Sequence, residues 1–249
     1  MYDFGGHGTS TAATVASAGK DDYAIYNNST KFKLAGMAPE AKIIPVKSLW
    51  SGGVIYGWLW ASGFELVDDR WTYTGSHKAD VISNSWGVTN FPLLNAGPGY
   101  DVLSVFSSLL VVPEILHKDY PGTLFVNSVG NNGIGYGSVG APNTSPFAIS
   151  VGATTNNVHL QYGPFFNITR FGPSAAGYDD VAEFSSRGPS LIGDPKPELL
   201  AIGSYGFVPA AVTVKNLESE KGDPNDDGAF SLFGGTSMAA PMVAGRQRS

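Results

Sequence analysis

Short runs of apolar residues, separated by longer mixed segments, dominate the pattern of this chain. Four runs have the length of a β-strand and no regular polar alternation, which is typical of parallel strands covered on both faces. They span 41–49, 79–87, 122–131 and 146–155. Amphipathic segments at 53–67 and 100–112 follow the first two runs. This alternation predicts an α/β fold of three layers, with a mostly parallel sheet and helices on both faces.

The predicted strand ends are rich in glycine and small polar residues. The first three runs end in or lead into SLWSGG, NSWG and GNNG. In sheets of this class, ligands bind beyond the carboxyl ends of the strands, and glycine lets another backbone approach closely. The pattern therefore indicates a functional site at this edge of the sheet.

Two further helices are expected near the two ends of the chain. One covers 5–19 and starts at His7, and the other starts at Ser237 in GTSMAAPMVAG. Each places a reactive side chain at a helix N-terminus, behind glycines. The polar segment 203–233 is predicted to form a loop.

An acidic turn within that loop matches half of a calcium-binding loop. The turn is DPNDDG at 223–228, which offers Asp223, Asn225 and Asp227 followed by Gly228. The glutamate expected at the twelfth position is absent, because Gly234 stands there. A solvated acidic turn is therefore favoured over a metal site.

Composition narrows the class of protein. The chain has 249 residues, 43% of them hydrophobic, which suits one domain with one large core. A net charge of −6 argues against a nucleic-acid partner or an anionic membrane surface. The absence of cysteine excludes a thiol nucleophile and disulfides. No apolar run is long enough for a membrane span, and the first residues lack the features of a signal peptide.

Three residues together point to hydrolytic chemistry. Ser237 at a helix N-terminus has backbone N–H groups and the positive end of the helix dipole beside it, which suits a developing oxyanion. His7, between small residues, can approach that serine as a general base. Asn131, after a buried strand, offers an amide donor for the same oxyanion.

The blocks that carry these residues resemble those of the subtilisin-like serine proteases, or subtilases, in the order of that family. They are GHGTSTAATVASAG, SVGNNG and GGTSMAAPMVAG. The segment 184–203, FSSRGPS…KPELLAIG, resembles the one that precedes the serine block in many members. IIPVKSL and VISNSWG resemble two core strands, so the resemblance covers nearly the whole chain.

The resemblance implies a role for each matching residue. Ser237 attacks the scissile carbonyl, His7 moves the proton, and Asn131 with the Ser237 N–H holds the oxyanion. For the substrate it implies a pocket lined by Ser85, Trp86 and Gly87, and pairing of an extended peptide along Gly52 and Gly53.

The sequence departs from the family pattern at both ends. In the family, the catalytic aspartate lies on an earlier strand, before the histidine block. In this chain only six residues precede His7. Asp3 lies in the approach to His7 and not at a strand end, so it is disfavoured as the orienting carboxylate. After Gly245 the chain turns to RQRS, where the family helix continues as apolar. We therefore expect residues 1–249 to be a single, incomplete subtilase catalytic domain that lacks the first strands with the aspartate and the last helices.

Other functions fit less well. An α/β-hydrolase esterase needs G-x-S-x-G, and Ala239 breaks this pattern around Ser237. A zinc hydrolase needs spaced ligands, which the four histidines do not supply. A non-catalytic subtilase-like binding or structural module remains the alternative, favoured by the missing aspartate.

The family reading also sets expectations for partners and location. The substrates expected are polypeptides bound in extended form, the protein is expected to be a monomer, and no metal site is assigned. No organic cofactor is implied, and calcium is common in the family as a stabiliser. An extracellular location is expected by analogy alone.

Overall fold

The computed structural model describes residues 3, 5–20, 22–24, 31–49, 53–89, 99–155, 180–204, 206–209 and 230–246. The helices are α1 (His7–Ala16), α2 (Val54–Ala61), α3 (Val102–Val111) and α5 (Thr236–Arg246). The strands are β1 (Tyr23–Ala24), β2 (Lys31–Phe32), β3 (Phe64–Val67), β4 (Arg70–Tyr73), β5 (Val81–Asn84), β6 (Leu124–Ser128), β7 (Ile149–Thr154), β8 (Leu199–Ile202), β9 (Gly206–Pro209) and β10 (Phe230–Phe233).

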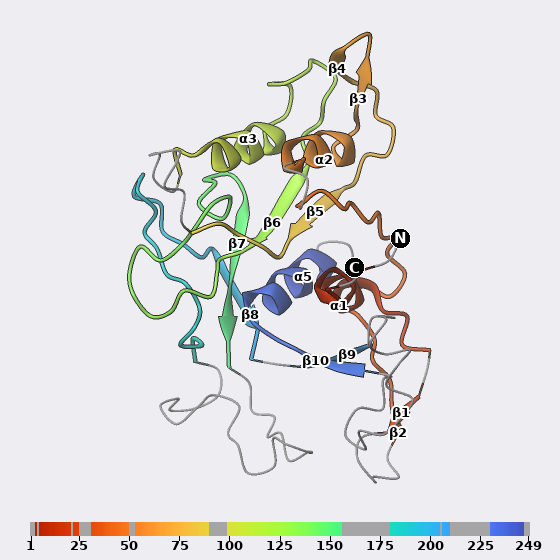
Figure 1. Cartoon of the computed structure of the whole chain (residues 1–249), viewed down its shortest axis with the longest axis vertical. Coiled ribbons are helices and arrows are strands. Elements are labelled where there is room, and N and C mark those ends of the chain that lie inside the picture. Colours follow the sequence, from red (N-terminus) through yellow and green to blue (C-terminus); the bar gives the residue numbers. More distant parts are fainter. Residues whose placement is uncertain are drawn as a thin grey trace.

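A parallel sheet in the order β5-β6-β7-β8 forms the centre of the molecule (Figure 1). Val81 pairs with Leu124, Val126 with Ile149, and Val151 with Leu199. β1–β2, β3–β4 and β9–β10 are small antiparallel pairs outside this sheet. Strands β5, β6 and β7 lie within three of the predicted apolar runs, and the predicted three-layer α/β fold is confirmed.

Helices cover both faces of the sheet. On β6, the side chain of Phe125 belongs to a core cluster with residues of α2 and α3, whereas Val126 belongs to one with residues of α5. Both side chains are fully buried. Neighbouring residues of a strand point to opposite faces, so a strand covered on both sides is apolar throughout. This explains why the strands show no polar alternation.

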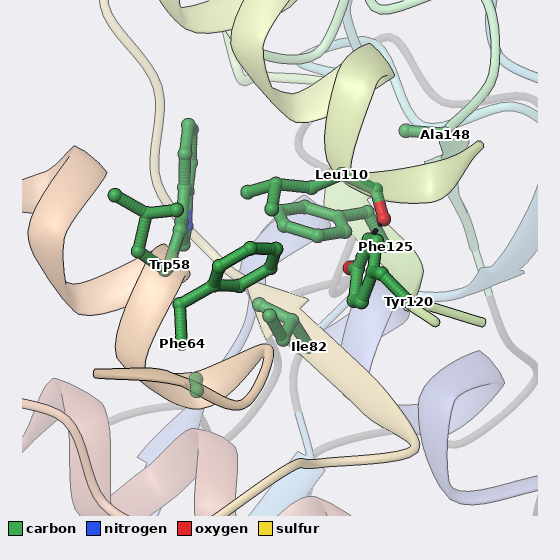
Figure 2. Close-up of a cluster of buried hydrophobic side chains, with 9 residues drawn as sticks. Trp58, Phe64, Ile82, Leu110, Tyr120, Phe125 and Ala148 are labelled. Carbon is green, nitrogen blue, oxygen red and sulfur yellow. Dashed lines mark hydrogen bonds between the residues drawn. The ribbon is translucent and has the colours of Figure 1, made fainter. Parts of the chain in front are cut away.

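Aromatic side chains build the core between the sheet and helices α2 and α3. Figure 2 shows Phe125 of β6 close to Phe64, Leu110 and Tyr120. Trp58 meets Phe125 edge-to-face, with ring centroids 5.4 Å apart. Tyr120 is 1% exposed, and its hydroxyl donates to the Leu110 carbonyl. The polar tip of this ring is therefore satisfied inside the core.

The predicted strand at 41–49 is wrong. These residues form no strand, and Ile43, Ile44 and Val46 are each more than 40% exposed. A lone extended segment gains no ladder hydrogen bonds, and no described strand pairs with it. The segment passes beside α2, where a Cβ on Gly57 would lie 2.7 Å from Ser48 Oγ.

The predicted helix at 53–67 is half right. α2 ends at Ala61, because Gly63 takes a φ of +91° and turns the chain into the β3–β4 hairpin. The helices expected at 5–19 and 100–112 are confirmed as α1 and α3. The final helix begins one residue before Ser237. The loop predicted at 203–233 contains β9 and β10 at its ends, and the acidic turn at 223–228 lies outside the described residues.

Candidate active site

Helices α1 and α5 pack against each other on one face of the sheet (Figure 1). His7 is the first residue of α1, and Ser237 is the second residue of α5. The packing of the two helices therefore places the predicted base and nucleophile at the starts of neighbouring elements. α5 also packs against β5, β6, β7 and β8, which fixes it to the sheet.

Ser237 and Ser85 exchange two hydrogen bonds just beyond the carboxyl end of β5. Ser85 Oγ donates to the Ser237 carbonyl over 2.9 Å, and Ser237 Oγ donates to the Ser85 carbonyl over 3.2 Å. Both residues are buried. The Ser237 carbonyl needs this donor, because residue i+4 is Pro241, which has no N–H for the helical bond.

Asn131 is exposed and holds the N-terminus of α5 through its carbonyl oxygen. Oδ1 accepts from the Thr236 N–H and from Thr236 Oγ1, both over 2.9 Å. Thr236 Oγ1 in turn accepts from the Gly130 N–H. With Oδ1 engaged in this way, the Nδ2 group of Asn131 faces elsewhere and is available as a donor.

Glycines allow the loop before α5 to lie close to these groups. Gly235 has a φ of +90°, and a Cβ there would lie 3.0 Å from Asn131 Nδ2. Its N–H donates to the Gly203 carbonyl, directly after β8. A Cβ on Gly203 would clash with Ala153 Cβ. Side chains at either position would push the start of α5 away from the sheet.

His7 lies at the start of α1 with part of its surface open to solvent. The ring packs edge-to-face on Phe233, with centroids 5.4 Å apart. Desolvation lowers the pKa of His7, and the negative charge of Asp3 opposes this shift. The lowered pKa favours the neutral imidazole, the form that a general base requires.

Asp3 caps helix α1. Its carboxylate accepts from the N–H groups of Gly5 and Gly6 and from both the N–H and hydroxyl of Thr9. Burial raises the pKa of this carboxyl, but the hydrogen bonds from Thr9, Gly6 and Gly5 outweigh it, so the pKa lies below its ordinary value. Oδ1 therefore binds the two residues that precede α1, and Oδ2 binds Thr9 in its first turn.

The structure brings some predicted residues together and leaves others apart. Ser85, Asn131 and Ser237 meet around the start of α5. Among the described residues, Ser237 Oγ donates to Ser85 and not to His7.

A buried polar chain aligns the strands that lead to this site. Trp58 Nε1 donates to Asn84 Oδ1 over 3.0 Å, and Asn84 Nδ2 donates to Asn127 Oδ1 over 2.9 Å. Asn84 ends β5, and Asn127 lies opposite it on β6. Since buried amides are costly without partners, these hydrogen bonds fix the register of β5 and β6 immediately before Ser85.

The remaining predicted substrate-binding residues have different surroundings. Trp86 is half-buried and stacks on Trp58, with centroids 5.7 Å apart, so its ring belongs to the core. Gly87 is exposed, and a Cβ there would lie 2.5 Å from Asn143 Nδ2. Gly53 precedes α2 and accepts from the Gly57 N–H. Gly52 lies outside the described residues.

No cluster of three or more histidine, aspartate or glutamate side chains that could hold a metal occurs in the part of the chain that the structure describes. In that same part, no helix is both long and apolar enough to cross a membrane.

A model of the subtilase family matches residues 1–247. The chain belongs to the subtilase family. Pyrolysin from Pyrococcus furiosus is 32% identical, over 98% of this chain and 17% of pyrolysin. Serine protease AprX from Bacillus subtilis is 27% identical, over 98% of this chain and 48% of AprX. The chain thus spans about half or less of these relatives.

Solved structures show the same fold. Sphericase superposes with a TM-score of 0.57 at 23% identity, and the match covers 98% of this subtilase chain and 62% of sphericase. The S41 psychrophilic protease gives a TM-score of 0.56 at 23% identity, with the same coverage. The subtilisin-like fold inferred from the sequence is confirmed.

Sequence reasoning missed two residues that contact the predicted site. Thr236 binds Asn131, and Phe233 packs on His7. Thr236 precedes Ser237 directly and offers a hydroxyl at the helix start, which was a usable signal. Phe233 carried no such signal, because its partner is 226 positions away in the chain.

Proposed function

We propose that this chain carries the nucleophile, the base and the oxyanion donors of a serine endopeptidase. The observation that carries the proposal is the start of α5, where Ser237 is bound to Ser85 and the preceding residue, Thr236, is bound to Asn131. Family membership supports the same reaction class. The alternative, a non-catalytic binding module, gives no reason for a serine and an exposed amide to converge at a helix N-terminus.

In this mechanism Ser237 Oγ attacks the scissile carbonyl of a bound peptide. The hydroxyl leaves the Ser85 carbonyl and turns toward His7, which accepts its proton at a ring nitrogen. His7 then gives this proton to the departing amine, which leaves Ser237 acylated. A water molecule attacks the acyl group in the same way, and this second step releases the acid. The lowered pKa of His7 favours the neutral ring that the first step requires.

Asn131 Nδ2 and the Ser237 N–H stabilise the oxyanion. The two bonds from Thr236 to Asn131 Oδ1 hold the amide so that its NH₂ group is the one left for the substrate. Exposure of Asn131 leaves room for a peptide there. A single donor of this kind is worth about 10²–10³ in turnover.

The carboxylate that orients His7 comes from outside the described residues in this proposal. Asp3 is engaged with the start of α1. β5 is an edge strand of the described sheet, and the apolar residues of 43–49 are exposed. A parallel strand added beside β5 would end at the same edge of the sheet as Ser85. A carboxylate side chain at the end of that strand would then lie at the site.

Polypeptides bound in extended form are the proposed substrates. Exposed Gly87, just beyond β5, is one candidate for close approach of substrate backbone, and Gly52 and Gly53 remain proposed for pairing with the extended peptide. The stacking of Trp86 on Trp58 gives it a supporting role behind this position. An extracellular location, a monomeric state and stabilisation by calcium are proposed by analogy with the family.

Labelling with a fluorophosphonate tests the proposal. The probe reacts with an activated serine, so we expect it to modify Ser237 in a chain extended upstream of residue 1, and more slowly in the present chain. Ser237→Ala is the matched control, and His7→Gln should reduce labelling while leaving the serine in place. If neither chain is labelled although both are folded, the catalytic proposal fails and the binding module stands.

A further inference from the structure

Phe233 connects the two helices that carry the proposed base and nucleophile. It ends β10, four residues before Ser237, and is 8% exposed. Its side chain forms a buried cluster with Val208 and Met238. Ala13 of α1 and Met242 of α5 pack against this cluster, so the cluster reaches both helices.

The same ring contacts His7 directly. The two rings meet at 79° with centroids 5.4 Å apart, the edge-to-face arrangement that aromatic pairs prefer. A histidine at the first position of a helix has no helical neighbour on its N-terminal side to restrict its rotamer. Packing on a buried ring supplies that restriction.

We propose that Phe233 is a positioning residue, which holds the His7 imidazole in place relative to Ser237 through its seat in the cluster with Met238. Met238 follows Ser237 in the chain, so a shift of the Phe233 ring would move both partners of the proton transfer. This inference rests on the proposed function, since the placement of His7 matters to catalysis only if His7 is the base.

The pKa of His7 provides a measure of its contact with Phe233. Desolvation lowers the pKa of His7, and Asp3 is the charged group among the described residues that opposes the shift. The cluster on the other side, Val208, Phe233 and Met238, has no charge. Loss of the Phe233 ring would admit water to the imidazole and bring its pKa back toward the ordinary value near 6.5.

Nuclear magnetic resonance of the histidine rings tests the proposal without requiring catalysis. The chain has four histidines, so His7→Gln identifies the signals of His7. In the unmodified chain we expect these signals to show a ring-current displacement and to titrate below 6.5. Phe233→Leu should abolish the displacement and raise the titration midpoint, and Phe233→Tyr should restore both.

Val208→Ala is the matched control, because it weakens the same cluster but keeps the aromatic ring that packs on His7. It should lower thermal stability while leaving the displacement and midpoint of His7 unchanged. The labelling rate gives a second readout in whichever chain Ser237 reacts with a fluorophosphonate. Phe233→Leu should slow labelling and shift the acid side of its pH–rate profile to higher pH. Phe233→Tyr should restore the rate.

Two outcomes would overturn the proposal. One is a His7 signal in Phe233→Leu identical to that of the unmodified chain, and the other is a change of equal size in Val208→Ala. Circular dichroism establishes that each variant is folded, and Phe233→Tyr supplies the comparison if the leucine variant is not. Since the ring signals do not depend on Ser237, positive results without labelling would reject the proposed function and leave the Phe233–His7 coupling intact.

Discussion

Ser85 Oγ donates to the Ser237 carbonyl, and Ser237 Oγ donates to the Ser85 carbonyl. The first bond replaces the helical one that Pro241 cannot make. In the second bond, the hydroxyl of Ser237, the proposed nucleophile, donates to a main-chain oxygen just beyond the end of β5. Together the two bonds join the sheet edge to helix α5, across 152 positions of sequence.

Ser85→Ala should destabilise the fold and slow the reaction of Ser237. The variant leaves the buried Ser237 carbonyl without its donor, which costs about 1–2 kcal/mol of unfolding free energy. Chemical denaturation measures this loss, and the rate of fluorophosphonate labelling measures the effect on the nucleophile. Ser83→Ala, at an exposed position on the same strand, is the matched control and should change neither.

Pro241→Ala should make Ser85→Ala less costly. An alanine at 241 restores an N–H that can bond the Ser237 carbonyl within α5, so the hydroxyl of Ser85 no longer has to replace that helical bond. A double-mutant cycle between the two positions measures the coupling, which we expect to be about 0.5–1 kcal/mol. Additive losses in the two single variants would show that Ser85 acts on Ser237 by another route.

Thr236→Val should weaken the proposed oxyanion donor without removing it. Valine keeps the shape and the N–H bond to Asn131, but loses the hydroxyl that donates to Oδ1 and accepts from Gly130. We expect labelling to slow by roughly tenfold, less than the 10²–10³ expected for Asn131→Ala. Thr236→Ser should restore the rate. An unchanged rate in the valine variant would mean that the Thr236 hydroxyl does not orient Asn131.

The sequence predicted three of the four strands of the parallel sheet, missed β8, and missed most of the contacts that assemble the site, for physical reasons. β5, β6 and β7 are legible because residues such as Phe125 and Val126 are buried on opposite faces, which leaves a local apolar signature. The run at 41–49 has the same signature but no described strand beside it, and strand formation depends on a neighbour that composition does not reveal.

The starts of helices could also be predicted from the sequence. Contacts between residues that are distant in the sequence could not. The places of His7 and Ser237 at helix starts could be predicted because each follows glycines. The bonds of Thr236 to Asn131 and of Ser85 to Ser237 join residues more than 100 positions apart, and no spacing rule encodes such pairs. The stacking of Trp86 on Trp58 was not predicted for the same reason, since Trp58 lies on another element.

Asp3→Asn should change the response to acid in two ways. The folded-state pKa of Asp3 is lowered, so its ionised form adds stability that is present above the ordinary pKa near 3.8 and is lost as the pH falls through the folded-state value. Asparagine keeps one acceptor oxygen and has no carboxyl to protonate, so the variant should be less stable at neutral pH but should lose less stability between pH 5 and pH 3 than the unmodified chain. Removing the negative charge should also lower the pKa of His7 further.

Thermal unfolding as a function of pH measures the first effect, and the titration of the His7 ring signals measures the second. Glu40→Gln removes an equal charge from an exposed position and should alter neither. A rise in the pKa of His7 in Asp3→Asn would contradict the assigned electrostatic coupling.

Lys196→Met should be the most destabilising of these substitutions. The Lys196 side chain is fully buried, and its ammonium donates to the carbonyls of Ser145 and Ala148 and to the Glu198 carboxylate. Glu198 also accepts from the Ser150 N–H, so the pair ties the start of β7 to the start of β8. Methionine would fill the space but leave these oxygens without the ammonium donor.

We expect Lys196→Met to lower the free energy of unfolding by about 3 kcal/mol. This is the lower end for a broken buried pair, because the Glu198 side chain is 36% exposed. Chemical denaturation measures it, with Lys42→Met at an exposed position as the control. Equal stability of the two variants would show that the buried ammonium contributes no more than a surface lysine.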